Sequence, residues 1–306
     1  MKKKLAFALG GGGSRGALQA GALRALLQAN IQPDLLVGTS IGSVNAIFMA
    51  MHGFSPQMLD KLDEAWLIVA KANLFPASTA WLTTQMLLNY VGVYPYSGIK
   101  DYFIAQGIRP DLRFGDLPHA PVILVSTDLN GRKPVYYGND PQDLVLDGLI
   151  ASVALPPWVS PIDAGGRMLV DGGMISNLPI EPALAYGATE IIAMGLSNPN
   201  EVSETMSGIG NTWTKFLNTI EARQIQLELA LARARNVPVH IIDLKTLVPV
   251  PVYDFSQTQF LLQDGYRQTK WVLDSGLLAQ LGQSDTWLLR LQKILQRPQK
   301  QRDKNE

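Results

Sequence analysis

The stretch "LLVGTSIGSVNAI", residues 35–47, places Ser40 between Gly38 and Gly42 in the order G-T-S-I-G. This G-x-S-x-G spacing is typical of a nucleophile elbow, in which a strand turns sharply into a helix and exposes a serine hydroxyl at the turn. A Cβ atom at either glycine would clash in so tight a turn. The apolar residues before the motif read as a short buried strand, and those after it read as a buried helix. The stretch therefore predicts a strand–turn–helix unit with Ser40 as the candidate nucleophile.

Length and composition limit the class of protein. The chain has 306 residues, 47% of them hydrophobic, which is enough for a substantial core in one large domain or two small ones. Lys and Arg together number 26, as do Asp and Glu, so the basic excess of a general nucleic-acid binder is missing. No cysteine is present, which excludes disulfides and thiolate metal sites. We expect no nucleic-acid partner.

Two stretches resemble membrane or targeting segments. Residues 2–4 are lysines that precede apolar residues, but the apolar run is too short for a secretory signal and reads better as a first strand. Residues 35–53 carry no charged side chain, yet their serine, threonine, asparagine and histidine residues favour a buried strand and helix over a membrane span. We therefore expect no transmembrane helix and a cytoplasmic location.

Strand-like and helical patterns alternate along most of the chain. This alternation predicts an α/β fold, a three-layer α/β/α sandwich with a largely parallel central sheet. Strands are expected at 4–9, 34–38, 120–128, 133–138, 167–171, 190–196 and 237–244, and helices at 17–29, 43–51, 55–69, 144–155 and 179–187.

A glycine-rich loop with the pattern Gly11-x-Gly13-x-x-Gly16 follows the first predicted strand and opens a helix. Taken alone, the pattern is a dinucleotide-binding fingerprint. That fingerprint also needs an acidic residue at the end of the second strand, and Asp34 precedes that strand instead. A phosphate-binding P-loop is excluded because no Lys-Ser or Lys-Thr follows Gly16.

The two glycine motifs fit together better as parts of one acyl-transfer site. Loops that follow adjacent parallel strands share one edge of the sheet, so the glycine loop and Ser40 are expected to face each other. Glycine N–H groups at Gly11, Gly12 and Gly13 could then donate to an oxyanion. The alternative is a tight strand-to-helix turn with no ligand.

A serine nucleophile needs a base. The three histidines are His52, after the elbow helix, His119, in a loop, and His240, inside a predicted strand. Only His240 could complete a triad in the order Ser, Asp, His, and a position within a strand suits a mobile base poorly. We interpret all three histidines as structural.

Asp171 is the other candidate base. It ends a predicted strand and is followed by Gly172 and Gly173. A carboxylate at the same sheet edge as Ser40 could accept the serine proton directly. The alternative is an ordinary Asp-Gly turn.

These motifs together resemble the patatin-like phospholipase family, in particular its compact bacterial members. The family pattern combines a G-x-G-x-x-G oxyanion loop, a G-x-S-x-G elbow and a D-G-G or D-G-A motif, and the "ASVALPPWVSPI" stretch at 151–162 resembles the segment before its aspartate. The resemblance covers a catalytic core at 5–195. It leaves 196–306 as a C-terminal extension packing on the core, with a strand near 237–244, terminal helices and a charged tail.

The resemblance implies a patatin-like sandwich and hydrolysis of lipid carboxylic esters without a cofactor or metal. Ser40 would be the nucleophile, and Asp171 would accept its proton and later activate water. The glycine loop, with Arg15 shaping it, would hold the oxyanion. The substrate would be a phospholipid, a lysophospholipid or another acyl ester.

Three other functions stay open from the sequence. An acyltransferase could use the same acyl-enzyme, but the related enzymes resemble G-H-S-x-G, and Thr39 stands where that histidine would be. A non-catalytic regulatory protein could keep the fold. A dinucleotide oxidoreductase would contain its cofactor.

Two further segments bear on membrane contact. Residues 72–99 are uncharged and aromatic-rich, typical of either a lid or an ordinary core helix. The apolar and basic helix at the C-terminus could lie on an anionic membrane surface or pack as a terminal helix. Together they could allow peripheral contact with the inner membrane surface.

Overall fold

The computed structural model describes residues 3–72, 96–156, 158–197, 209–246, 249–276 and 278. The expectations for the C-terminal helix and tail, and for most of the uncharged segment at 72–99, lie outside these residues. Residues 96–99 begin helix α5.

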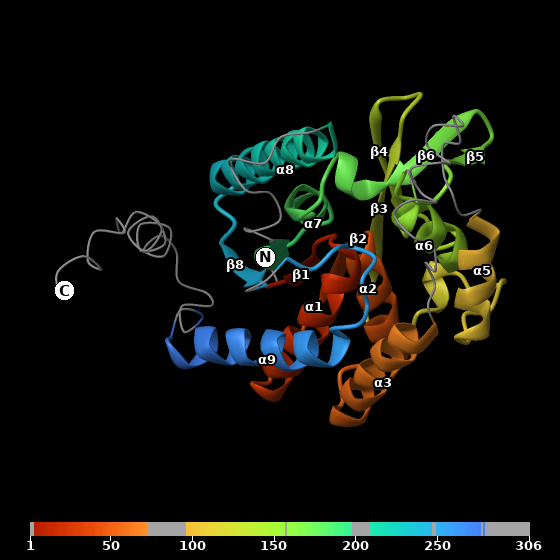
Figure 1. The fold of residues 1–306 in the computed structure, drawn as a ribbon. Coiled ribbons are helices and arrows are strands. Elements are labelled where there is room, and N and C mark those ends of the chain that lie inside the picture. Colours follow the sequence, from red (N-terminus) through yellow and green to blue (C-terminus); the bar gives the residue numbers. More distant parts are fainter. Residues whose placement is uncertain are drawn as a thin grey trace, which may run out of the picture.

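One mixed, mostly parallel sheet forms the centre of the molecule, in the order β5-β6-β3-β2-β1-β7-β8 with β4 paired to β3 (Figure 1). The parallel strands are β1 (Leu5–Leu9), β2 (Leu35–Thr39), β3 (Val122–Asp128), β7 (Glu190–Ser197) and β8 (Val239–Lys245). The antiparallel pairings involve β4 (Lys133–Tyr137), β5 (Ile162–Ala164) and β6 (Arg167–Asp171).

Helices cover both faces of this sheet (Figure 1). On β1, Phe7 and Leu9 point to one face, and Ala6 and Ala8 point to the other. The first face packs against α1 (Gly16–Gln28), α2 (Ile41–His52), α3 (Pro56–Ala72), α5 (Tyr96–Ala105), α6 (Val145–Val153) and α9 (Thr258–Asp274). The second packs against α7 (Ile180–Ala185) and α8 (Ile209–Ala234). The predicted three-layer α/β/α class is confirmed.

The uncharged stretch at 35–53 forms β2 and α2, as expected. Within the described residues, no helix has both the length and the apolar character needed to span a bilayer.

The register of β3 brings the two candidate catalytic segments together. One edge of β3 pairs with β4 over Leu124–Asp128. The other edge pairs first with β2, up to Thr39 opposite Val125, and then with β6, whose Asp171 lies opposite Ser126. Because β2 and β6 run in opposite directions along this edge, their C-terminal ends meet.

The sequence placed Asp171 at the same sheet edge as Ser40 but left the direction of its strand open. In the structure β6 is antiparallel to β3. Asp171 still lies close to Ser40, because β6 runs toward the end of β2 and its last residue pairs with Ser126, next to Val125.

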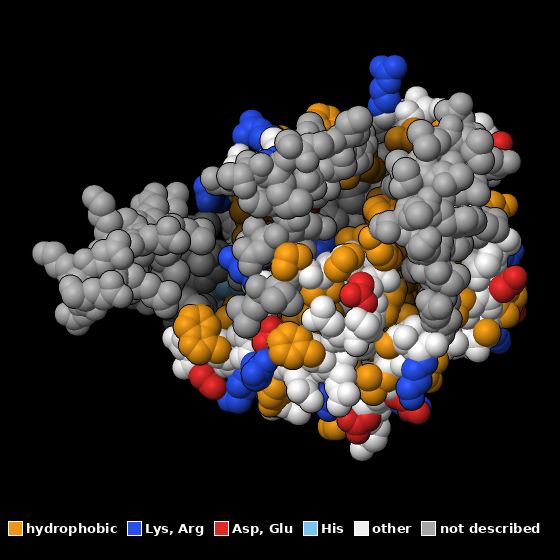
Figure 2. Space-filling model, in the orientation of Figure 1, with side chains coloured by type: hydrophobic (Ala, Val, Ile, Leu, Met, Phe, Trp, Pro, Cys, Tyr) orange, Lys and Arg blue, Asp and Glu red, His pale blue; other side chains and the backbone are white. Residues whose placement is uncertain are grey.

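The C-terminal part of the chain contributes to the same core. Strand β8 pairs with β7, and α9 lies across α1. The two helices approach closely at glycines: a Cβ on Gly265 would lie 1.9 Å from the Leu18 carbonyl oxygen. The outer side of α9 leaves Phe260 and Trp271 exposed, and hydrophobic side chains stand on the surface along this helix (Figure 2).

The glycine contact between α1 and α9 generates a stability prediction. Gly265→Ala should lower the free energy of unfolding by about 1–3 kcal/mol, because the backbone of Leu18 leaves no room for a methyl group. Gly98→Ala is the matched control, since an added Cβ on this helical glycine meets nothing within 4 Å. Denaturant titration should show the control unchanged or stabilised by up to about 1 kcal/mol. Equal stability of the two variants would contradict the packing.

Candidate active site

Ser40 occupies a strained turn between β2 and α2. Its φ of 53° and ψ of −125° are unusual for a residue with a side chain, and such a conformation costs on the order of 1–3 kcal/mol. The neighbouring glycine is required by space, since a Cβ on Gly42 would lie 2.1 Å from the Leu9 carbonyl oxygen. The N-terminus of α2 begins at Ile41, so its positive end lies beside the serine and favours negative charge there.

Ser152 on α6 holds this turn in place. Its hydroxyl accepts the Ser40 backbone N–H at 3.0 Å and lies 2.6 Å from the Val125 carbonyl oxygen, to which it donates. Its single proton is then used, so the Ser43 hydroxyl, at 2.7 Å, must be the donor in their contact. All three hydrogen-bonding positions of Ser152 are occupied, which fixes the backbone of Ser40 against β3.

Asp171 is buried at the end of β6 and carries a perturbed pKa. Its Oδ1 accepts the Gly173 N–H at 2.7 Å, and its Oδ2 accepts no hydrogen bond of ordinary geometry from the described residues. Burial raises the pKa of Asp171 to about 6, while the hydroxyl of Ser40 and the N–H of Gly173 limit the rise. A carboxyl with this pKa can accept a proton near neutral pH.

The glycine loop lies directly against Ser40. A Cβ on Gly11 would lie 3.1 Å from the Cβ of Ser40. The Gly11 N–H is already donated to the Asn177 carbonyl oxygen, whereas those of Gly12 and Gly13 donate to no group in the described part of the chain. Arg15 is buried, and its Nε donates to the Gly12 carbonyl oxygen at 3.2 Å.

A buried polar network supports the same loop from behind. Trp66 donates its indole N–H to Asn45, and Asn45 donates to the Gly16 carbonyl oxygen and to Gln19. Gln19 in turn donates to the carbonyl oxygen of Gly10, at 2.8 Å. Satisfied buried networks of this kind make a loop rigid.

Asn177 joins the glycine loop to the aspartate loop. Gly172 and Gly173 form a short 3-10 turn after Asp171, and Asn177 follows four residues later. Its backbone carbonyl holds Gly11, and its Oδ1 lies where a Cβ on Gly11 or Gly173 would project. The three segments predicted to form the site therefore meet in one place.

The described residues include no cluster of three metal-ligating side chains. Asp34, weighed as a ribose ligand, accepts the backbone N–H of Leu5 at the opposite end of the sheet.

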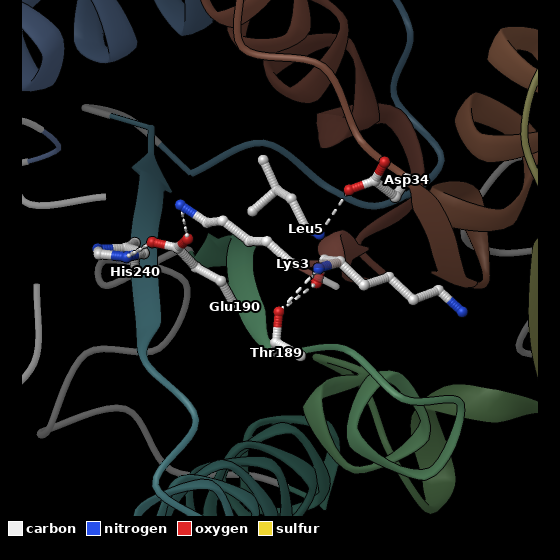
Figure 3. A network of polar contacts seen from close by, with 7 residues as sticks. Lys3, Leu5, Asp34, Thr189, Glu190 and His240 are labelled. Atoms are coloured by element: carbon white, nitrogen blue, oxygen red, sulfur yellow. Dashed lines mark hydrogen bonds and ion pairs between the residues drawn. The ribbon is translucent and has the colours of Figure 1, made fainter. Parts of the chain in front are cut away.

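The histidines lie away from Ser40. His240 on β8 is three strands from β2, about 14 Å across the sheet, and its Nε2 lies 2.9 Å from buried Glu190. Glu190 also pairs with Lys3 near the starts of the strands (Figure 3). His52 ends α2, about 18 Å along the helix from Ser40, and His119 donates its backbone N–H to Ala50 beside it. None of the three can accept the Ser40 proton in this structure.

An apolar cavity of about 350 Å³ runs beside α2. Ile41, Val44, Phe48 and Met51 form one stripe of the helix that lines it, and residues of α3, α5 and α6 form the other walls. Because Ile41 follows Ser40, one end of the cavity adjoins the candidate nucleophile. Met51, ten residues further along the helix, lies about 15 Å from Ile41 along the same wall.

The sequence comparisons identify the family. The model of the patatin-like phospholipase family matches residues 7–184, so the chain belongs to this family. Mouse patatin-like phospholipase domain-containing protein 7 is 27% identical over 302 residues, covering 90% of this chain and 21% of its own length. Lysophospholipase nte1 of Aspergillus terreus is 24% identical, covering 89% of this chain and 18% of its own. The chain thus spans about a fifth of these relatives.

Among solved structures, VipD from Legionella pneumophila matches with a TM-score of 0.49 and 16% identity, covering 89% of this chain and 67% of that one.

Two positioning residues were missed in the sequence. Ser152 could have been found as the serine inside the otherwise apolar run at 149–155, and it lies in the "ASVALPPWVSPI" stretch noted above. Asn177 gave a weaker signal, because an asparagine soon after Asp-Gly-Gly reads as part of the turn.

Asp171 gives a stability prediction that does not depend on activity. Its folded pKa lies above the unfolded value, so ionisation of this buried carboxyl opposes folding as the pH rises. Asp171→Asn should therefore be more stable than the wild type at pH 8, by about 2–3 kcal/mol. This gain should shrink through pH 6 to 4 and vanish below the unfolded pKa. Denaturant titrations at pH 8 and pH 3.5 test it, and a variant less stable at pH 8 would contradict the burial argument.

Proposed function

We propose that the protein is a serine acyl hydrolase that cleaves carboxylic esters of lipids, of the phospholipid or lysophospholipid type, through Ser40 and Asp171. The observation that carries the proposal is the meeting of β2 and β6 on one edge of β3. It brings Ser40 close to a buried carboxyl oxygen that has no other partner among the described residues. Membership in the patatin-like phospholipase family and the lysophospholipase name of a relative support the same activity.

In this mechanism Ser40 Oγ attacks the ester carbonyl carbon and Asp171 Oδ2 takes the serine proton. The tetrahedral intermediate collapses, the proton passes from Asp171 to the leaving alcohol, and an acyl-enzyme remains. Asp171 then accepts a proton from water as the water attacks. Collapse of the second intermediate returns this proton to Ser40 and releases the carboxylic acid.

The oxyanion of each intermediate needs donors that are fixed before the reaction. The N–H groups of Gly12 and Gly13 suit this role, since Gly11 already donates to Asn177. Arg15 holds the loop through the carbonyl oxygen of Gly12. Loss of one such donor typically costs about 2.7–4 kcal/mol of barrier.

The cavity beside α2 supports a lipid substrate. An acyl chain bound there would place its ester carbon at Ser40 and its methyl end toward Met51. If an alcohol replaced water in the second step, the same acyl-enzyme would make the protein an acyltransferase. A non-catalytic regulatory protein is the other alternative. Three predictions from the sequence also stay predictions: a cytoplasmic location, contact with a membrane surface and a domain division at residue 195.

The proposed dyad predicts selective labelling of Ser40. A fluorophosphonate probe should form one adduct, on Ser40, that Ser40→Ala abolishes and Asp171→Asn slows by roughly 10²- to 10⁴-fold. Labelling by the wild type should also slow as the pH falls through about 6, because the protonated carboxyl cannot accept the serine proton. Mass spectrometry locates the adduct.

Asp34→Asn serves as the control, because this carboxylate lies at the far end of the sheet. If Asp171→Asn were labelled at the wild-type rate, the result would contradict the proposed role of Asp171 as the base.

The cavity predicts a dependence on chain length. Met51→Trp should lower kcat/KM for long-chain p-nitrophenyl esters by about tenfold or more and leave acetate and butyrate esters within about twofold, because only the far end is filled. Ile68→Trp, at an exposed position of the neighbouring helix α3, is the control. A uniform loss over all chain lengths would argue against this cavity as the acyl site.

A further inference from the structure

Helix α8 carries a row of polar side chains that faces the loop after Asp171. Glu221, Gln224 and Glu228 are spaced three and four residues apart, so they share one side of the helix. The helix follows the segment matched by the family model, which ends at residue 184. Nothing in the motifs of the sequence connects it with the site.

Each member of the row binds the loop at a different residue. Glu221 accepts the Asn177 side-chain N–H at 2.6 Å. Gln224 donates to the Met174 carbonyl oxygen at 2.8 Å. Glu228 accepts the Ser176 hydroxyl with one oxygen and the Glu181 backbone N–H with the other, both at 2.7 Å.

These three loop residues are the ones that connect with the three catalytic segments. Met174 belongs to the turn that directly follows Asp171. The Ser176 carbonyl oxygen accepts the hydroxyl of Thr39, which precedes the candidate nucleophile. Asn177 accepts the Gly11 N–H through its backbone carbonyl.

We propose that α8 is a positioning element of the active site. Its polar row, in which Glu228 makes two of the hydrogen bonds, clamps the 172–177 loop. The loop in turn sets the elbow, the aspartate and the glycine loop relative to one another. The inference rests on the proposed function and concerns the same site. The hydrogen bonds described above join the three α8 residues to this loop and to α7, so each would act through the loop.

The burial of Glu228 agrees with this role. The residue is 5% exposed, and a carboxylate is rarely buried unless hydrogen bonds satisfy it. Burial raises the pKa of Glu228 to about 7, opposed by the hydrogen bonds from Glu181, Ser176 and Ile180 and reinforced by the nearby charge of Glu181. Measurements at pH 8 therefore test the ionised form, which accepts at both oxygens.

The test compares Glu228→Leu, which removes both acceptors at similar size, with Glu228→Gln, which keeps one. Gln226→Leu makes the same kind of change on the exposed side of α8. At pH 8, Glu228→Leu should reduce kcat for a short p-nitrophenyl ester and fluorophosphonate labelling of Ser40 roughly 10- to 100-fold, with KM within about twofold. Glu228→Gln should recover most of the loss, and Gln226→Leu should match the wild type.

Hydrogen exchange reports on the clamp independently of activity. The Ile175 and Ser176 N–H groups donate to the Gly172 carbonyl oxygen and should exchange at least tenfold faster in Glu228→Leu. Unchanged exchange would overturn the clamp even if the wild type were inactive, whereas absence of both labelling and hydrolysis in the wild type would overturn the proposed function alone. Unchanged kcat with faster exchange would overturn the positioning role. If Glu228→Leu does not fold, Gln224→Leu replaces it in each comparison.

Discussion

The site depends on one edge of β3, which β2 and β6 share from opposite directions. The backbone hydrogen bonds of β3 fix how far each strand advances, so the separation of Ser40 and Asp171 follows from strand register. A slip of one residue in β6 would turn Asp171 to the other face of the sheet. The proposed dyad would thus be built from the ends of strands, which are rigid supports for a site.

Burial raises the pKa of Asp171 to about 6, as the proposed role of proton acceptor requires, and it has a cost in stability. The charge of Asp171 is unfavourable in its dry surroundings, and the positive φ of Ser40 adds backbone strain beside it. Ser152 holds the backbone of Ser40, and Asn177 and the chain from Trp66 to Gln19 hold the glycine loop beside it. A site that contains a buried charge and a strained backbone needs neighbouring polar groups with complete hydrogen bonding to keep it in a single geometry.

Much of the fold was readable from the sequence because its signals are local. Each strand and helix predicted within the described residues is present, since apolar runs and glycine turns report on nearby residues. Helices α5 and α8 were not predicted, and α9 was covered only by the general expectation of terminal helices after residue 196. The close contact of α1 with α9 relies on backbone proximity at glycines. The inner side of α8 mixes its polar row with Ile225, Leu229 and Ala232, so the hydrophobic pattern of this helix is interrupted.

For the site, Ser40, Asp171 and the glycine loop were predicted as neighbours, and the structure brings them together. The direction of β6 was not predicted, because the order of motifs along a chain does not reveal strand direction. Ser152 and Asn177 act through the backbone of other residues, which no spacing in the sequence encodes.

The position of β1 in the middle of the sheet determines when the molecule can become complete. One edge of β1 pairs with β2, about 30 residues further along the chain. The other edge pairs with β7, which begins at Glu190 and is synthesised much later. During synthesis the nascent chain therefore exposes an apolar strand edge for most of its length, and pairing at such sequence separation is slow. A ribosome-bound chain that ends after the motif at Asp171 has β2 to pair with one edge of β1 but lacks β7 for the other edge. Chaperone protection of that second edge would therefore matter most before β7 and β8 emerge.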